Sequence, residues 1–249
     1  MLKVNTVTKY FNRNTPSEVL ALDQVSIELK AKEFLVIIGS NGSGKSTILN
    51  LVAGNIFCEE GKIFIADHDV TSQKDFQRSK WIARVFQDPL KGTAPELSII
   101  DNFRLASLRT KRKGFRTGIN SKFRNEIAQR IAVLNLGLEN KLDTLVGKLS
   151  GGQRQALTLL MASMDEPKIL LLDEPTAALD PRSSELVIKL ADKLIAENNL
   201  TAILVTHNLK QAIEYGSRLI MMDKGKILHD FISPEKNNLK LNDLQNWFA

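Results

Sequence analysis

The segment Gly39–Thr47 constrains this chain more than any other, because it lies between two apolar runs, Phe34–Ile38 and Ile48–Val52. Its glycines, lysine and serine have the spacing of a phosphate-binding loop (P-loop). Glycine permits backbone conformations that a Cβ would block, so that successive N–H groups can converge on phosphate oxygens at the start of a helix. The sequence therefore predicts a buried strand, a phosphate-binding loop and a helix in succession. The predicted nucleotide-binding residues are Gly39, Ser40, Asn41, Gly42, Ser43, Gly44, Lys45, Ser46 and Thr47.

Two side chains of this P-loop have separate predicted roles. Lys45 is expected to reach the β- and γ-phosphates, and the Ser46 hydroxyl is expected to ligate Mg²⁺. The alternative is a glycine-rich turn that binds nothing. The Lys-Ser pair, placed between a strand and a helix, argues against that alternative.

Length and composition predict a soluble globular protein with a sizeable core. The chain has 249 residues, of which 43% are hydrophobic and 25% are charged, as in ordinary soluble domains. Its longest apolar runs are far shorter than the roughly 18 residues of a membrane span. The start of the sequence lacks the apolar region of a signal peptide, so a cytosolic location is expected. The one cysteine, Cys58, excludes an internal disulfide and is expected to be a small core residue.

The net charge of +6 permits an anionic partner. Much of the excess lies in one basic segment, which has no Asp or Glu and contains Arg109, Lys111, Arg112, Lys113, Arg116, Lys122 and Arg124. Two interpretations stay open. The segment is either a solvated loop and helix face, or a contact for lipid head groups or for the acidic surface of a partner.

Hydrophobic periodicity predicts alternating strands and helices, and therefore an α/β protein. The expected strands are Leu2–Val7, Leu20–Leu22, Val25–Leu29, Phe34–Ile38, Gly61–Ala66, Trp81–Phe86, Lys168–Leu172, Thr201–Val205, Arg218–Met222 and Lys226–Asp230. The expected helices are the one after the P-loop, Ile99–Leu108, Lys122–Leu136, one that opens within Leu149–Gln155 and runs to about Met164, Arg182–Glu197, Leu209–Tyr215 and a short amphipathic one within Leu239–Phe248. A turn is expected at Asp67–Asp69. The helical block between strands looks like an inserted subdomain.

Polar residues follow two of the apolar strands, where parallel strand ends form a ligand-binding edge. Asp173 and Glu174 follow Lys168–Leu172. Asp173 is expected to hold Mg²⁺ through a water, and Glu174 to polarise water for attack on the γ-phosphate. His207 follows another strand and is expected to contact the γ-phosphate, although a lone histidine at a strand end more often has a structural role.

Taken in order, these motifs resemble the ATP-binding subunit of an ABC transporter over essentially the whole chain. The motifs that carry the resemblance are the P-loop, Gln87, Leu149-Ser150-Gly151-Gly152-Gln153, Ile169–Asp173 with Glu174, Ala178-Leu179-Asp180 and His207. The resemblance implies ATP and Mg²⁺ as cofactors. It implies that Gln87 is both a metal ligand and a catalytic residue, beside Lys45, Glu174 and His207. Phe11 is the residue that best matches the aromatic stacked on adenine, with Tyr10 as the alternative.

The resemblance also implies a fold and a domain organisation. A P-loop NTPase core with a mostly parallel sheet, comprising residues 1–87 and 165–249, should carry an N-terminal antiparallel β subdomain. Residues 88–164 should form an inserted helical subdomain that carries the signature segment Ser150–Gln153.

In this family two subunits assemble head to tail and sandwich two ATP molecules. The implied partner is a second copy or a related ATPase subunit, which would contribute its Ser150, Gly151, Gly152 and Gln153. A helix start at Ser150 is a second anion-binding helix end, too far along the chain for its own P-loop to need it. ATP binding would close the dimer and hydrolysis would open it, which would drive transmembrane permease subunits.

The segments Phe86–Ser98 and Leu149–Met161 and the basic segment resemble ATPases of bacterial uptake systems of amino-acid type, including those for aromatic amino acids. Such systems add a periplasmic or surface substrate-binding protein, and the ATPase lies at the cytoplasmic face of the cell membrane. An exporter or lipid-handling system is an alternative. A soluble ABC ATPase acting on nucleic acid or ribosomes is disfavoured, because such relatives usually carry two domains, a coiled coil or zinc-binding cysteines.

Overall fold

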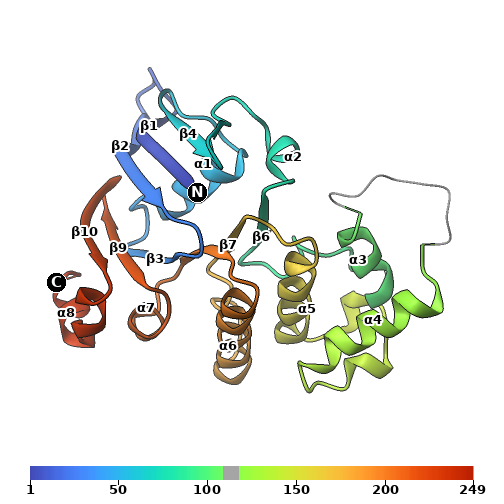
Figure 1. Cartoon of the computed structure of the whole chain (residues 1–249). Helices are drawn as coiled ribbons and strands as arrows, with labels where there is room; N and C mark the ends of the chain where they lie inside the picture. Colours follow the sequence, from blue (N-terminus) through green and yellow to red (C-terminus); the bar gives the residue numbers. More distant parts are fainter. Residues whose placement is uncertain (109–117, 249) are drawn as a thin grey trace.

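Two β-sheets organise the chain in the computed structural model, which describes residues 1–108 and 118–248 (Figure 1). One sheet is antiparallel, with strand order β2-β1-β4-β5. Its strands are β1 (Leu2–Phe11), β2 (Val19–Leu29), β4 (Glu60–Ile65) and β5 (His68–Asp69). This sheet is the predicted N-terminal antiparallel β subdomain.

The second sheet has strand order β10-β9-β3-β8-β7-β6. Its strands are β3 (Phe34–Gly39), β6 (Ile82–Val85), β7 (Ile169–Asp173), β8 (Thr201–Val205), β9 (Arg218–Asp223) and β10 (Lys226–Ile232). All neighbouring strands are parallel except β10, which runs antiparallel to β9. The predicted α/β class with a mostly parallel sheet is confirmed.

The helices cover both faces of this mostly parallel sheet. They are α1 (Lys45–Ala53), α2 (Asp75–Arg78), α3 (Ile99–Ala106), α4 (Ser121–Ala132), α5 (Gly151–Ser163), α6 (Pro181–Glu197), α7 (Leu209–Glu214) and α8 (Leu241–Asn246). Short 3₁₀ turns occur at Leu138–Asn140, Val146–Lys148 and Glu235–Asn238. In Figure 1, α1 lies on the side of the antiparallel sheet, whereas α5, α6 and α7 lie on the opposite side of the parallel strands.

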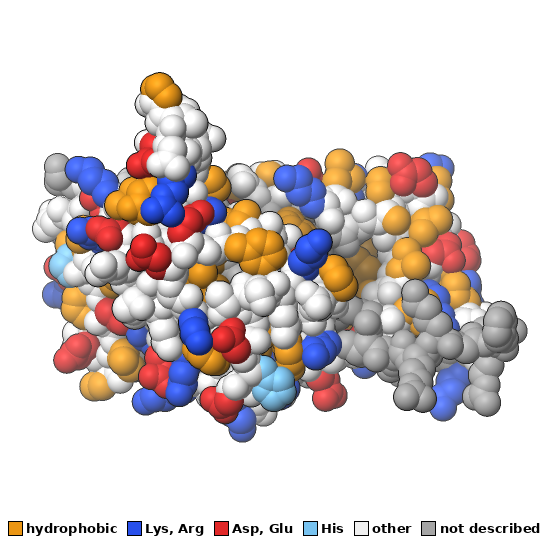
Figure 2. Space-filling model, turned by 90° about the horizontal axis from the view of Figure 1, so that it is seen from above, with side chains coloured by type: hydrophobic (Ala, Val, Ile, Leu, Met, Phe, Trp, Pro, Cys, Tyr) orange, Lys and Arg blue, Asp and Glu red, His pale blue; other side chains and the backbone are white. Residues whose placement is uncertain are grey.

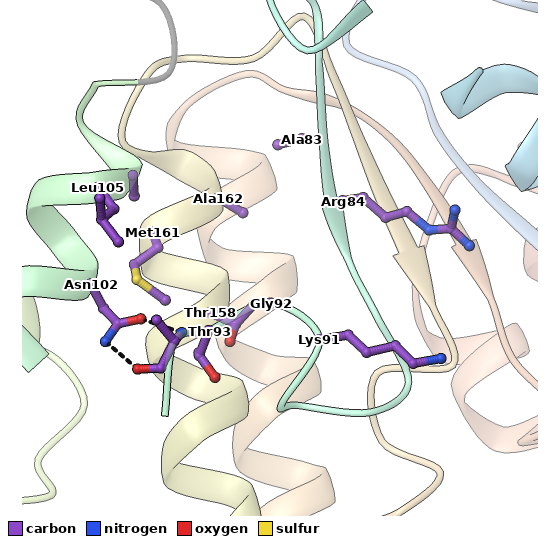
Figure 3. Close-up of a pocket in the computed structure, with 12 residues that line it drawn as sticks. Ala83, Arg84, Lys91, Gly92, Thr93, Asn102, Leu105, Thr158, Met161 and Ala162 are labelled. Atoms are coloured by element: carbon purple, nitrogen blue, oxygen red, sulfur yellow. Dashed lines mark hydrogen bonds between the residues drawn. The ribbon is translucent and has the colours of Figure 1, made fainter. Parts of the chain in front are cut away.

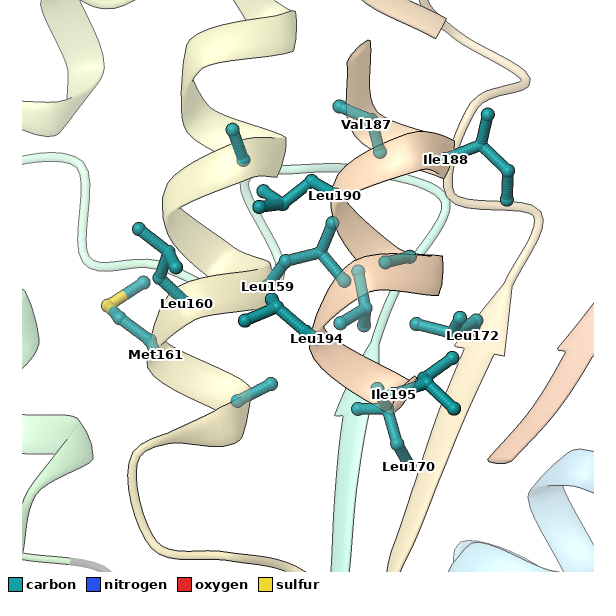
Figure 4. Packing of buried hydrophobic residues seen from close by; sticks show 14 of the residues in the cluster. Leu159, Leu160, Met161, Leu170, Leu172, Val187, Ile188, Leu190, Leu194 and Ile195 are labelled. Carbon is teal, nitrogen blue, oxygen red and sulfur yellow. The ribbon is translucent and has the colours of Figure 1, made fainter. Parts of the chain in front are cut away.

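The parallel strands are apolar at nearly every position because both of their faces are covered. Along β3, Leu35 and Ile37 pack with α1 and the antiparallel sheet, whereas Val36 and Ile38 pack with the helices of the other face. Figure 4 shows the second of these layers, where α5 and α6 pack over Leu170 and Leu172 of β7. This packing on both faces fixes the strand ends at one edge of the sheet.

Several local predictions were wrong or incomplete. Leu20–Leu22 and Val25–Leu29 belong to one strand, because β2 pairs with β1 through register shifts that absorb the polar residues between them. The expected turn Asp67–Asp69 contains the short strand β5, which pairs with β4. Cys58 is half-buried at the edge of a core cluster rather than within it. The helix α2 was not predicted.

Five of the seven residues of the basic segment lie outside the described residues. The other two are on α4, where Arg124 forms a two-point ion pair with Asp143 at 3.0 and 2.6 Å. On the face shown in Figure 2, cationic and anionic side chains are interspersed. A contact of the segment with lipid or an acidic partner therefore stays a prediction, as do the subdomain boundaries at residues 88 and 164. Within the described part of the chain, no helix has the length and apolar character needed to cross a membrane.

Candidate nucleotide-binding site

The P-loop joins the end of β3 to the start of α1, as predicted. Strand β3 lies inside the sheet, between β9 and β8. Gly39 is required by close approach, because a Cβ there would lie 2.2 Å from the Met222 carbonyl oxygen. Gly42 has φ +79°, and nothing lies within 4 Å of the position of a Cβ. The loop therefore packs tightly at its base and is open at Gly42.

Lys45 lies inside this loop. Its Nζ donates to the carbonyl oxygens of Gly39 at 2.9 Å and Ser40 at 2.8 Å. Burial lowers the pKa of Lys45, and the nearby carboxylates of Glu174 and Asp173 act in the opposite direction. The predicted phosphate-binding cation is thus held at the loop by backbone oxygens, and it interacts electrostatically with the predicted general base Glu174 and the predicted metal ligand Asp173.

The serines of the loop differ in their surroundings. Ser43 Oγ is buried and has no hydrogen-bond partner among the described residues. Ser40 Oγ donates to Asp223 Oδ1 at 3.3 Å, and the Gly225 N–H donates to the Ser43 carbonyl oxygen at 3.1 Å. The turn between β9 and β10 therefore supports the P-loop, whereas Ser46, in the first turn of α1, is exposed.

The strand ends bring Asp173, Glu174 and His207 to the same edge of the sheet. The Glu174 N–H donates to the Val205 carbonyl oxygen at 3.0 Å, which ties the end of β7 to the end of β8. His207 Nδ1 lies 3.2 Å from Glu174 Oε2. Glu174 has φ +45°, a left-handed conformation that costs a non-glycine residue about 1–3 kcal/mol and that often occurs at functional sites.

Gln87 and Phe11 are placed less closely. Gln87 is exposed and lines a cavity of about 570 Å³ together with Asp173 and Ala178. Phe11 ends β1 with an exposed ring, and Lys9 Nζ lies 5.6 Å from the ring centroid. Tyr10 is half-buried beneath Arg13. No hydrogen bond or ring contact joins either aromatic to the P-loop in the described part of the chain.

The signature segment begins α5. Ser150 Oγ accepts from the Gln153 N–H at 3.2 Å, and Gln153 Oε1 accepts from the Ser150 N–H at 3.0 Å. A Cβ on Gly151 would lie 3.3 Å from Leu179 Cδ2, so the signature packs against the predicted Ala178–Asp180 loop of its own chain. Among the described residues, no hydrogen bond or ion pair joins Ser150–Gln153 to the P-loop.

Two buried polar groups near the site were not predicted. Arg84 on β6 donates from Nη2 to Asp173 Oδ2 at 2.6 Å. Gln211 on α7 accepts from the hydroxyls of Thr206 at 3.0 Å and Thr176 at 3.4 Å, which joins the two loops that carry His207 and Glu174. A polar residue in an otherwise apolar strand was the available signal for Arg84.

Comparison with known proteins shows the family to which the chain belongs. The sequence profile of the ABC transporter family matches residues 22–177, more than half of the chain. A tyrosine transport ATP-binding protein of Clostridioides difficile (strain R20291) is 40% identical over 248 residues, which cover 100% of this chain and 98% of the relative. A phosphonates import ATP-binding protein of Lactococcus lactis subsp. cremoris (strain SK11) is 31% identical over 240 residues, 94% of each chain.

Solved structures with the same fold are also found. A dimeric ATP-binding cassette in a post-hydrolysis state, bound to ADP and phosphate, aligns with a TM-score of 0.79 at 29% identity and covers 93% of this chain and 98% of that one. A cassette of an ABC transporter in its ADP conformation aligns with a TM-score of 0.80 at 26% identity, over 100% of this chain and 98% of that one.

The chain belongs to the ABC transporter family. It is an ATP-binding and ATP-hydrolysing subunit, which confirms the predicted activity. The import systems among its relatives support the predicted importer.

Proposed function

We propose that the chain powers the uptake of an amino acid, specifically an aromatic one such as tyrosine. The observation that carries this substrate is the 40% identity, over the whole chain, to a tyrosine transport ATP-binding protein. The ATPase itself does not touch the transported solute, so the substrate class rests on that relationship. The chemistry below rests on this chain's own residues.

ATP is held by the P-loop in this proposal. The backbone N–H groups of Gly39–Thr47 and the start of α1 bind the phosphates, and Lys45 neutralises their charge. The open space at Gly42 and the Ser43 hydroxyl, which has no hydrogen-bond partner among the described residues, support a loop that binds an anion. The adenine stacks on the exposed ring of Phe11.

Mg²⁺ fits the donors present. Among the described residues, no group of three His, Cys, Asp or Glu side chains could hold a metal by itself. Mg²⁺ usually takes one or two carboxylates together with substrate phosphates, and Asp173, the Ser46 hydroxyl and the Gln87 amide supply such a partial set. The ion, when bound with ATP, would neutralise charge on the phosphates.

Glu174 is the proposed general base, which accepts a proton from the attacking water. Its backbone is fixed by the hydrogen bond to Val205, and its carboxylate is oriented by His207. His207 is largely exposed on its other side, with a side-chain exposure of 60%, so it is free to contact the γ-phosphate. One residue then prepares the nucleophile while the other senses the leaving phosphate.

The second half of each site comes from the partner subunit, in a head-to-tail arrangement of two copies or of this chain with a related subunit. The exposed Ser150 and the start of α5 would bind the γ-phosphate held by the opposite P-loop. Loss of that phosphate on hydrolysis removes the bridge between the subunits. Dimer opening and closure is therefore the mechanical output.

We further propose that the permease docks on a cleft of about 550 Å³ between α3, α5 and the segment that follows Gln87. Asn102 on α3 fixes Ala94 in that segment through hydrogen bonds to its N–H at 2.7 Å and its carbonyl oxygen at 3.0 Å (Figure 3). Movement of the signature helix would thus reach the permease. This docking places the subunit at the cytoplasmic face of the cell membrane, with a substrate-binding protein on the opposite side.

Reconstitution tests the substrate. The ATPase would be purified with the permease and binding protein encoded beside it and placed in proteoliposomes. Tyrosine added on the binding-protein side should stimulate ATP hydrolysis and accumulate inside, whereas a phosphonate should do neither. Stimulation by phosphonate alone, or export of preloaded tyrosine, would contradict the proposal.

A further inference from the structure

We infer that Arg84 is a positioning residue for the metal-binding carboxylate, and that it holds Asp173 in the orientation that Mg²⁺–nucleotide requires. The inference rests on the proposed metal role of Asp173. It adds a residue that neither the motifs nor the proposed chemistry contains.

The guanidinium of Arg84 connects three elements around the site. Its Nη2 donates to Asp173 Oδ2 at 2.6 Å, at the end of β7. Its Nη1 donates to the side-chain oxygens of Asn50 on α1 at 2.7 Å and of Asn55, just after α1, at 2.9 Å. The helix that carries Lys45 and the strand that carries Asp173 are therefore joined through one side chain.

The geometry leaves Asp173 able to act on a metal. Arg84 engages only Oδ2, and Oδ1 accepts no hydrogen bond from the described residues. The carboxylate is thus fixed by one oxygen while the other stays free. Groups that orient a ligating carboxylate in this way commonly affect metal affinity by about 10- to 100-fold.

The position of Arg84 also argues against a purely structural role. Figure 3 shows Arg84 pointing away from Ala83, Met161 and Ala162, on the opposite side of β6. Its side chain is only 11% exposed, and Nε is buried without a partner in the described part of the chain. Buried ion pairs often contribute less stability than apolar residues of the same volume. Retaining an incompletely satisfied arginine here is accounted for by its hold on Asp173.

Arg84 is also close to the predicted metal ligand Gln87. The guanidinium lies over the ring of Phe86, with Cζ 4.8 Å from the centroid, and Gln87 is the next residue. Arg84, Gln87 and Asp173 line one cavity of about 570 Å³. The Arg84 guanidinium therefore holds the predicted metal ligand Asp173 and stacks on the residue before the predicted ligand Gln87.

The test is a Mg²⁺ titration of fluorescent ATP binding to the isolated subunit, independent of turnover. Arg84→Met should weaken the Mg²⁺ dependence by about 10- to 100-fold, while nucleotide affinity in EDTA changes by less than about twofold. Unchanged Mg²⁺ affinity would reduce Arg84 to a structural residue. Tighter Mg²⁺ binding would show that Arg84 competes with the metal, and would also overturn the inference.

Matched variants separate charge from geometry. Lys91→Met removes a cation from the wall of the same cavity, and its side chain makes no hydrogen bond or ion pair among the described residues, so Mg²⁺ affinity should stay unchanged. Arg84→Lys should restore Mg²⁺ affinity only partly, because one ammonium group cannot make the hydrogen bonds of both Nη1 and Nη2. Full restoration would overturn the positioning argument. A loss as large in Lys91→Met as in Arg84→Met would do the same.

Two further variants keep the test decisive. Asn55→Ala leaves Arg84 in place, changes an exposed residue and should weaken Mg²⁺ binding by a few-fold. This variant replaces Arg84→Met if Arg84→Met does not fold. Unchanged Mg²⁺ binding in Asn55→Ala would then count against the inference. Asp173→Asn tests the underlying assumption. If Asp173→Asn leaves the Mg²⁺ dependence intact, the proposed metal role fails and the inference falls with it; if only the Arg84 variants are silent, the metal role stands.

Discussion

Two helices begin at the segments predicted to bind phosphate, and they begin differently. At the start of α1, the N-cap residue Gly44 has no side chain that could cap the helix, and the first turn contains no acidic residue. At the start of α5, Ser150 and Gln153 satisfy each other's N–H groups in a capping box. Helix starts leave N–H groups without partners. The P-loop helix thus has no side-chain cap at its start, whereas the signature helix has two of its first N–H groups capped by its own chain and leaves those of Gly151 and Gly152 for the proposed partner's nucleotide.

The largest expected effect concerns the part of the site around the P-loop. It tests whether the chain that carries the P-loop also supplies the general base. Glu174→Gln keeps the size of the side chain and removes the base, so ATP hydrolysis should fall by about 10²- to 10⁴-fold. Binding of fluorescent ATP should persist, because Glu174 does not hold the nucleotide.

Glu166→Gln is the matched control, since Glu166 is exposed and its side chain has no partner among the described residues. Turnover of Glu174→Gln within a few-fold of normal would remove Glu174 from the proposed role. A base contributed by the partner would then have to be sought.

The next effect tests the signature half. Ser150→Arg places a long cation on the exposed start of α5. In the proposed shared site, the nucleotide held by the partner's P-loop lies at this position. The ATP-dependent dimer of the Glu174→Gln background should be lost in size-exclusion chromatography, while ATP binding to the monomer is retained. Ser121→Arg, at the exposed start of α4, is the control; an intact dimer in the Ser150 variant would contradict the sandwich arrangement.

The same contrast explains what sequence could predict. The P-loop and the pair Asp173-Glu174 are contiguous patterns, and the apolar strands around them could be found from periodicity alone. Arg84 and Asp173 are 89 positions apart, and their contact depends on the register of β6 against β7. Gln211 similarly reaches Thr176 across two elements. Such contacts depend on how distant elements pack, and a sequence pattern does not predict them. The short strand β5 and the helix α2 were missed because a few residues carry no periodicity.

A smaller effect concerns the hydrogen bonds that hold together the loops after β7 and β8. Gln211→Leu leaves the buried hydroxyls of Thr176 and Thr206 without this partner, which should lower the free energy of unfolding by about 1–3 kcal/mol. Gln211→Met also removes the amide and should lose as much, because Nε2 donates to Thr176 and Oε1 accepts from both hydroxyls. Urea unfolding measures both variants. A loss below about 0.5 kcal/mol in both would show that this amide is not what stabilises the two loops.

The smallest effect separates the two signature glycines and returns to the contrast between the helix starts. A Cβ on Gly152 would lie 2.6 Å from the Cβ of Ser183 on α6, so Gly152→Ala should destabilise the fold by about 1–3 kcal/mol through overpacking. A Cβ on Gly151 meets only the mobile end of Leu179, at 3.3 Å. Gly151→Ala should therefore change the free energy of unfolding of the monomer by less than about 0.5 kcal/mol.

Gly151→Ala then discriminates between two reasons for a glycine at the start of α5. If the variant unfolds like the parent chain but forms a weaker ATP-dependent dimer, Gly151 serves the close approach of the partner's nucleotide. If it destabilises the monomer as much as Gly152→Ala does, both glycines serve packing within the chain. Neither glycine would then be evidence for contact with a second subunit.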